Sequence, residues 1–143
     1  MSPDRDMALV ELARDECLSL LRSFTVGRVA IASPSGSVLV VPVNYIVDGE
    51  VIVFRSDPGE KLDRLHGAPA SFQIDFIDPV HHTGWSVLAQ GTAHRASAAE
   101  VSHLDIESWA GGEKSHWVRV VPHAITGRRL VLPALPLDLR GYL

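Results

Sequence analysis

Hydrophobic and polar positions alternate along most of this chain with the two-residue period of a β-strand. Valine, isoleucine and aromatic residues at alternating positions are typical of strands that bury one face. Segments with this pattern predict seven strands. They cover residues 26–32, 38–47, 51–56, 70–77, 85–95, 116–121 and 124–131.

Turn residues separate these segments. Asp48-Gly49 is the strongest hairpin signal and joins the second segment to the third. Residues 33–36 form a turn after the first segment, and Pro122 divides the last two. Gly91 lies inside a strand pattern, where a glycine is typical of a bulge. Links this short favour antiparallel neighbours.

Three short helices are expected among the strands. Residues 15–23 carry apolar side chains at helical spacing, and residues 60–66 follow a turn. Ser97 precedes Glu100 in the pattern of a capping box, which would open a helix that runs toward Ile106. The pattern as a whole predicts a mainly β fold, an antiparallel barrel with helices at its ends.

Composition limits the class of protein. The chain has 143 residues, 46% of them hydrophobic and 21% charged, which predicts one globular domain over residues 1–143 with peripheral tails at 1–8 and 133–143. A net charge of -4 argues against nucleic acid as a partner. The polar N-terminal residues do not resemble a signal peptide, and no apolar run approaches the ~18 residues of a membrane span. With Cys17 as its one cysteine, we expect a cytoplasmic protein.

The end of the third strand has the composition of an anion site. Arg55 and Ser56 precede a turn at residues 57–59, after which a helix is expected to begin near Lys61. Free N–H groups at a helix N-terminus bind anions, and cationic side chains beside them add to the attraction. These groups could therefore hold one phosphate. The alternative is an ordinary solvated surface, because Arg and Lys beside a turn are common.

Pro42 interrupts an apolar strand. Proline cannot donate to a sheet ladder, so it indicates either an edge strand or a gap in the sheet. In a gap, the neighbouring backbone and the Asn44 amide could bind a flat heteroaromatic ring. The Asp48-Gly49 hairpin would bring that gap close to Arg55.

Six motifs, in one order, resemble the pyridoxamine 5'-phosphate oxidase-like family of the FMN-binding split-barrel superfamily, and particularly its small actinobacterial branch. The similarity extends from about Leu9 to Leu132. The motifs are Val41-Pro42-Val43-Asn44-Tyr45 with Asp48-Gly49, Val53-Phe54-Arg55-Ser56, Gly59-x-Lys61-Leu62, Gly84-Trp85-Ser86-Val87 with Gly91, His116-Trp117-Val118-Arg119-Val120, and Ile125-Thr126-Gly127-Arg128.

This resemblance implies a six- to seven-stranded antiparallel split β-barrel that forms a homodimer with FMN at the interface. Cofactor contacts would come from the ring-lining strand, the phosphate cluster and a strand that completes the site across the dimer. By the family pattern these residues are Val41, Pro42, Val43, Asn44, Arg55, Ser56, Lys61, Leu62, Trp85 and Ser86. The substrate side or the interface would include His116, Trp117, Arg119 and Arg128.

The chain also departs from the family pattern. Pyridoxamine phosphate oxidases carry an Arg-Lys pair where this chain has Glu60-Lys61, and they end in an Arg-rich segment that is absent here. Vitamin B6 oxidation is therefore not the expected reaction.

The expected function is that of a flavin-dependent oxidoreductase, in which hydride moves between FMN and a small electron-poor or aromatic substrate without a dedicated catalytic residue. One alternative is a reductase that uses the deazaflavin coenzyme F-420. Another is a protein that binds flavin, haem or lipid without turnover. Motifs for serine hydrolases, Rossmann or P-loop sites are absent, and the adjacent His81 and His82 lack metal-ligand spacing, so no metal is expected.

Overall fold

The computed structural model describes residues 8–33, 35–56, 67–104 and 116–131. This part of the chain contains seven strands and two short helices. In chain order they are β1 (Ala8–Glu11), α1 (Arg14–Ser23), β2 (Val26–Ala32), β3 (Val38–Asp48), β4 (Val51–Ser56), β5 (Ala68–Asp78), β6 (Thr83–Ala96), α2 (Ala98–Val101) and β7 (His116–Val131).

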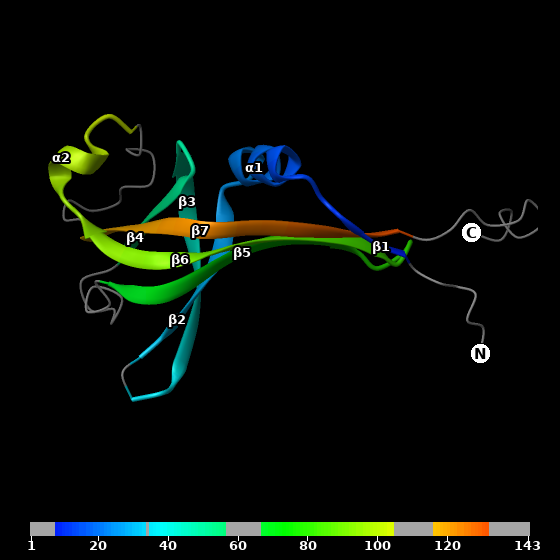
Figure 1. The fold of residues 1–143 in the computed structure, drawn as a ribbon, viewed down its shortest axis with the longest axis horizontal. Coiled ribbons are helices and arrows are strands. Elements are labelled where there is room, and N and C mark those ends of the chain that lie inside the picture. The colour runs from blue at the N-terminus through cyan, green and yellow to red at the C-terminus, as the bar shows by residue number, and fades with distance from the viewer. Residues whose placement is uncertain (1–7, 34, 57–66, 105–115, 132–143) are drawn as a thin grey trace, which may run out of the picture.

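Six of the strands close an antiparallel barrel. The order of neighbours is β7-β4-β3-β2-β5-β6, and pairing of β6 with β7 completes the ring. The first strand, β1, adds to the edge of β7 outside this ring. Figure 1 shows β5, β6 and β7 running together along the long axis, while β2 and β3 extend away from them as an arm. The mainly β fold is confirmed.

The core fills the barrel and continues under α1. Tyr45 and Phe72 meet in an edge-to-face contact with ring centroids 4.7 Å apart. Cys17 and Leu21 place the inner side of α1 against this core. A buried helix face and buried strand faces therefore share one hydrophobic interior, as the alternating pattern predicts. Burial raises the pKa of the Cys17 thiol, so this cysteine is core packing.

The last two expected strands are one continuous strand, so that prediction was wrong. The register of β6 and β7 shifts at Gly91: Gln90 faces Ala124, but Gly91 faces Pro122. The irregularity absorbs one residue and accommodates the proline that lacks an N–H donor. The bulge expected at Gly91 is confirmed, and it explains why Pro122 does not end the strand.

The ends of the chain differ from expectation as well. Ala8 belongs to β1 rather than to a tail, because residues 8–11 pair with residues 128–131 of β7. The capping box of α2 is present, but the helix ends at Val101 and stops short of the expected length. The expected helix at residues 60–66 lies outside the described residues. No helix in the described ranges has the length and apolar character needed to cross a bilayer.

Candidate functional site

The most important feature for a site is that β3 has two halves with different neighbours. Its first half pairs only with β2, from Val38 to Asn44. Its second half pairs with β4, where the register ends at Tyr45 opposite Phe54. Pro42 lies in the half that β4 does not pair, which is where a residue without an N–H is tolerated. Among the described residues, β4 therefore does not pair with the half of β3 that holds Pro42, and we call this place the β3–β4 parting.

The predicted ring and phosphate residues lie on the two sides of this parting. If the register continued, Asn44 would face Arg55 and Val43 would face Ser56. Strand alternation places Asn44 and Arg55 on the outer face, and Val43 and Ser56 on the inner face with the core. Asn44 is exposed, whereas Val43 and Ser56 are buried. At the parting, the Asn44 amide and the Arg55 guanidinium therefore lie on the outer face of the barrel, while the opposite, inner face is buried.

Beyond the parting, β4 is held by the start of β7. Arg55 pairs with Trp117 and Ser56 pairs with His116. The Ser56 hydroxyl donates to the His116 carbonyl over 3.4 Å. The Nδ1 atom of His116 is buried without a hydrogen-bond partner among the described residues. A buried polar atom without a partner is costly, so this corner has an unused position for a hydrogen bond to a ligand.

Arg119 lies two pairs further along β7 than Trp117, opposite Val53, and its side chain contacts α2. Its Nη1 lies 3.4 Å from Glu100 Oε2, and the Arg119 side chain is 26% exposed. The N–H of Ser97, which donates to the Glu100 carboxylate, lowers the pKa of Glu100, and the charge of Arg119 adds to this effect. The carboxylate therefore stays ionised and holds the guanidinium in place, on the same outer face as Arg55.

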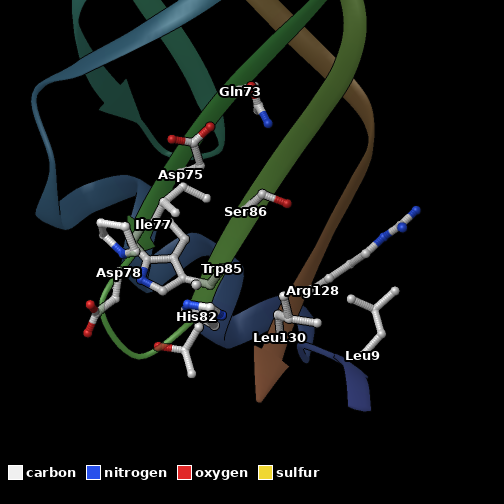
Figure 2. A pocket seen from close by; sticks show the side chains of 13 residues that line it. Leu9, Gln73, Asp75, Ile77, Asp78, His82, Trp85, Ser86, Arg128 and Leu130 are labelled. Carbon is white, nitrogen blue, oxygen red and sulfur yellow. The ribbon is translucent and has the colours of Figure 1, made fainter. Parts of the chain in front are cut away.

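Trp85 and Ser86 are neighbours on β6 but point to opposite faces. The Trp85 ring packs against Phe24, with centroids 5.3 Å apart, at the end of α1. Ser86 points outward, as Figure 2 shows. Both residues nevertheless line one cleft, Trp85 from its edge and Ser86 from its floor.

Ser86 belongs to an open cleft of about 470 Å³ on the outer face of β5, β6 and β7, which we call the outer cleft. Figure 2 shows its lining. Trp85 and Arg128 contribute to it as well, but β5 and the turn after it supply most of the residues that sequence reasoning missed. The missed residues are Leu9, Gln73, Asp75, Ile77, Asp78, Pro79, His82, Thr83, Gly84 and Leu130. The alternation of Gln73, Asp75 and Ile77 against a buried row is the signal that could have identified this face.

The predicted site residues lie in two separate places on the barrel. Asn44, Arg55, Ser56, His116 and Trp117 gather around the β3–β4 parting. Ser86 and Arg128 face one another across β6 and β7 in the outer cleft, on other strands of the barrel. Lys61 and Leu62 lie outside the described residues. Among the described residues, no group of three His, Cys, Asp or Glu side chains is placed so that it could hold a metal ion.

The comparisons with known proteins agree with this fold. Residues 13–129 match the family described as pyridoxamine 5'-phosphate oxidase. An uncharacterized protein of Mycobacterium tuberculosis is 31% identical over 139 residues, covering 91% of each chain.

Two solved structures are also similar. The FAD binding protein from Mycobacterium smegmatis has a TM-score of 0.66 at 32% identity, with 85% of this chain and 98% of that chain covered. A candidate pyridoxamine 5'-phosphate oxidase from Corynebacterium glutamicum has a TM-score of 0.72 at 29% identity, with 89% and 96% covered. Since the family match spans most of the chain and the barrel is shared, this protein is a member of the pyridoxamine 5'-phosphate oxidase family.

Proposed function

We propose that the protein is a flavin-dependent oxidoreductase that binds FMN between two copies of the chain and moves hydride to or from a small electron-poor or aromatic substrate. The observation that carries the proposal is the β3–β4 parting, because among the described residues β3 and β4 stop pairing beside Asn44 and Arg55. Family membership supports a flavin, and so does the similarity to a FAD binding protein.

The residues around the parting fit a flavin nucleotide. The ring would lie along Val41 to Asn44, where backbone groups and an amide can hydrogen-bond to a heteroaromatic edge. Arg55 and Ser56, together with Lys61, which lies outside the described residues, would hold the phosphate. The unpartnered Nδ1 of His116 adds a polar position at the same corner. The flavin, when bound, supplies the two-electron redox chemistry, and the chain fixes its place.

The chain's own contribution is orientation rather than acid–base catalysis. Arg119 is held by Glu100, so it can position a substrate but cannot accept a proton. We expect the His116→Ala and Arg119→Ala variants to keep turnover with a quinone acceptor as long as flavin stays bound. If one of these variants still binds flavin but loses turnover, the replaced residue is catalytic, and the prediction that no dedicated catalytic residue is needed is wrong.

A titration of flavin-free protein tests the proposal. FMN, FAD, F-420 and haem are added separately, and binding is followed by fluorescence for the flavins and F-420, and by absorbance for haem. We expect saturable FMN binding that the Arg55→Ala variant weakens by about tenfold or more, because a charge-assisted hydrogen bond to phosphate is lost. Arg22→Ala is the matched control, since Arg22 donates to the Gly49 carbonyl at the other end of the hairpin.

Each result of this titration has a definite meaning. If the protein prefers F-420, its cofactor is the deazaflavin rather than FMN. If it prefers haem, it is a haem-binding protein without turnover. If it binds flavin tightly but no acceptor reoxidises the reduced flavin, it is a flavin-binding protein and not an enzyme. No binding of any cofactor, with both variants folded, would contradict the flavin site altogether.

A further inference from the structure

A short segment at one end of the barrel connects β6 to the β3–β4 hairpin. It consists of α2 and its flanking residues, 97–104, and we call it the α2 strap. Figure 1 shows α2 directly after the end of β6. Glu100 Oε2 lies 3.4 Å from Arg119 Nη1 on β7, and His103 Nε2 lies 3.0 Å from Asp48 Oδ2 at the end of β3. Because neighbouring strands follow the order β6, β7, β4 and β3, the strap contacts the strands on both sides of β4.

The apolar side of the strap faces the barrel. Val101, which follows Glu100, is 5% exposed. On β4, Val53 is the cross-strand neighbour of Arg119, and strand alternation places it on the outer face with Arg55. Val53 is nevertheless only 1% exposed, and neither valine is part of the hydrophobic cluster that fills the barrel. The outer face is therefore covered at Val53, between the two polar contacts of the strap.

This covered place lies in line with the proposed flavin site. The ring would lie along residues 41–44 and the phosphate at Arg55, so the ligand would extend along the strands toward the hairpin. Val53 is the next outward-facing residue of β4, and Arg119 pairs with it. Arg55 and Arg119 are therefore diagonal cross-strand neighbours, which lie about 7–8 Å apart in a sheet. A ligand that continued beyond the phosphate would meet Arg119 and the strap.

The cation at this place is already paired within the chain. The N–H of Ser97 and, to a smaller extent, the charge of Arg119 lower the pKa of Glu100, so the Glu100 carboxylate is ionised at neutral pH. Together, Glu100 and Arg119 carry no net charge. A second phosphate beyond the one at Arg55 would have to displace this carboxylate before Arg119 could bind it. A ligand with one phosphate leaves the ion pair intact.

We propose that the α2 strap restricts the site to a flavin that ends at one phosphate, and that Glu100 is the residue that determines this specificity. The inference rests on the proposed function and deepens it, because it selects a flavin mononucleotide over a flavin dinucleotide. The strap covers the outer face beyond the phosphate, and the carboxylate withholds Arg119 from a second phosphate. Glu100 acts through Arg119 and does not contact the flavin, so it is a positioning residue.

Isothermal titration calorimetry of flavin-free protein measures the Kd of FMN and of FAD, and this readout needs no turnover. We expect the wild type to bind FMN about tenfold more tightly than FAD. Glu100→Gln keeps an oxygen that can accept from the Ser97 N–H, but it removes the charge that faces Arg119. This variant should gain affinity for FAD relative to FMN by about threefold or more, because Arg119 can then bind the second phosphate.

Glu16→Gln is the matched control. Glu16 is the third residue of α1, as Glu100 is of α2, and it likewise accepts from the backbone N–H at the start of its helix. The control therefore makes the same change of charge and of capping group on the other helix, and the ratio of the two Kd values should stay that of the wild type. In the double variant Glu100→Gln/Arg119→Gln, the gain for FAD should disappear.

The outcomes separate this inference from the proposed function. If the wild type binds FAD as tightly as FMN, or more tightly, the flavin site stands and the inference is wrong; this result needs no variant to fold. The inference is also wrong if Glu100→Gln changes both affinities alike, if Glu16→Gln changes the ratio equally, or if the gain for FAD persists without Arg119. If the wild type binds neither flavin, the proposed function fails and the inference fails with it.

Discussion

Tyr45 connects the barrel to α1 through a single buried hydrogen bond. Its hydroxyl donates to the Leu21 carbonyl over 2.7 Å, near the C-terminal end of the helix, where carbonyls lack partners within the helix. Tyr45→Phe leaves that carbonyl buried without a donor. We expect a loss of about 1–2 kcal/mol in the free energy of unfolding, measured by denaturant titration at neutral pH. An unchanged midpoint would show that water or another donor replaces the hydroxyl.

The same residue gives the protein a stability limit at high pH. Burial raises the pKa of the Tyr45 hydroxyl far above its ordinary value, because the interior disfavours the phenolate. The unfolded chain loses this proton near pH 10, while the folded chain keeps it. The protonated Tyr45 hydroxyl therefore contributes its full stabilisation of the folded state below about pH 10, and this stabilisation falls as the pH rises further. The difference in stability between wild type and Tyr45→Phe should shrink above that pH in thermal scans.

His82 occupies a backbone conformation that favours glycine. Its φ is 56°, and it is the one non-glycine residue with positive φ among the described residues. The left-handed region costs an L-residue about 1–2 kcal/mol, part of which glycine recovers. His82→Gly should therefore raise the free energy of unfolding by about 0.5–1 kcal/mol. His81→Gly should lower the free energy of unfolding, because the contact between the His81 ring and Asp78 is lost. If both variants are more stable than the wild type, this explanation is wrong.

Individual side chains could be predicted where strand alternation alone decides their position. Asn44, Arg55 and Ser56 reach the β3–β4 parting because a two-residue hairpin fixes their register. The grouping of Trp85 with Ser86 came from a motif, and both residues line the outer cleft. Family resemblance names residues, but only the pleat assigns them to one face or the other.

At the scale of elements, the bulge between β6 and β7 holds the tightest backbone contact of the glycines that the structure describes. A Cβ on Gly91 would lie 1.9 Å from the Val121 carbonyl oxygen, and backbone cannot move aside as a side chain can. Gly91→Ala should cost more than about 3 kcal/mol of stability, or prevent folding. Gln90→Ala, one residue away and exposed, should change stability by less than about 0.5 kcal/mol. Circular dichroism during urea unfolding compares the two.

The elements that sequence analysis misjudged are those that long-range pairing decides. Four residues of β1 carry too little pattern to predict a strand, and β7 supplies the partner that makes them one. Pro122 reads locally as a break, but the opposite glycine lets β7 continue through it. Most of the other strands were predicted to within a few residues, because their alternation is long and their turns are short.

At the scale of the whole molecule, the exposed apolar side chains of the β2–β3 arm favour a homodimer. Val38 and Val40 are 64% and 57% exposed on its outer face, and Val26, which pairs with Asn44 at the other end of the β2–β3 pairing, is 57% exposed. Apolar surface in a contiguous patch is typical of an interface. We expect the wild type to be a dimer by light scattering, and Val40→Asp to shift it to monomer with an unchanged circular dichroism spectrum.

A charge placed elsewhere provides the control for this prediction. Ser19 is exposed on α1, away from the arm, so Ser19→Asp should remain dimeric. If Val40→Asp stays a dimer, the arm is not the interface. If the wild type is a monomer at micromolar concentration, the site between two copies fails as well.

The position of β7 in the barrel also determines when the protein can fold during its synthesis. This strand is the last described element of the chain, yet it pairs with β1, β4 and β6, and β1 is the first described strand. Until residues 116–131 leave the ribosome, β4 and β6 each lack their neighbour, and the ring cannot close. A nascent chain stalled before β7 therefore carries free strand edges, which bind other strands readily. We expect chains truncated before residue 116 to aggregate more readily than the 143-residue chain, because pairing with β7 covers one edge of β4 and one edge of β6.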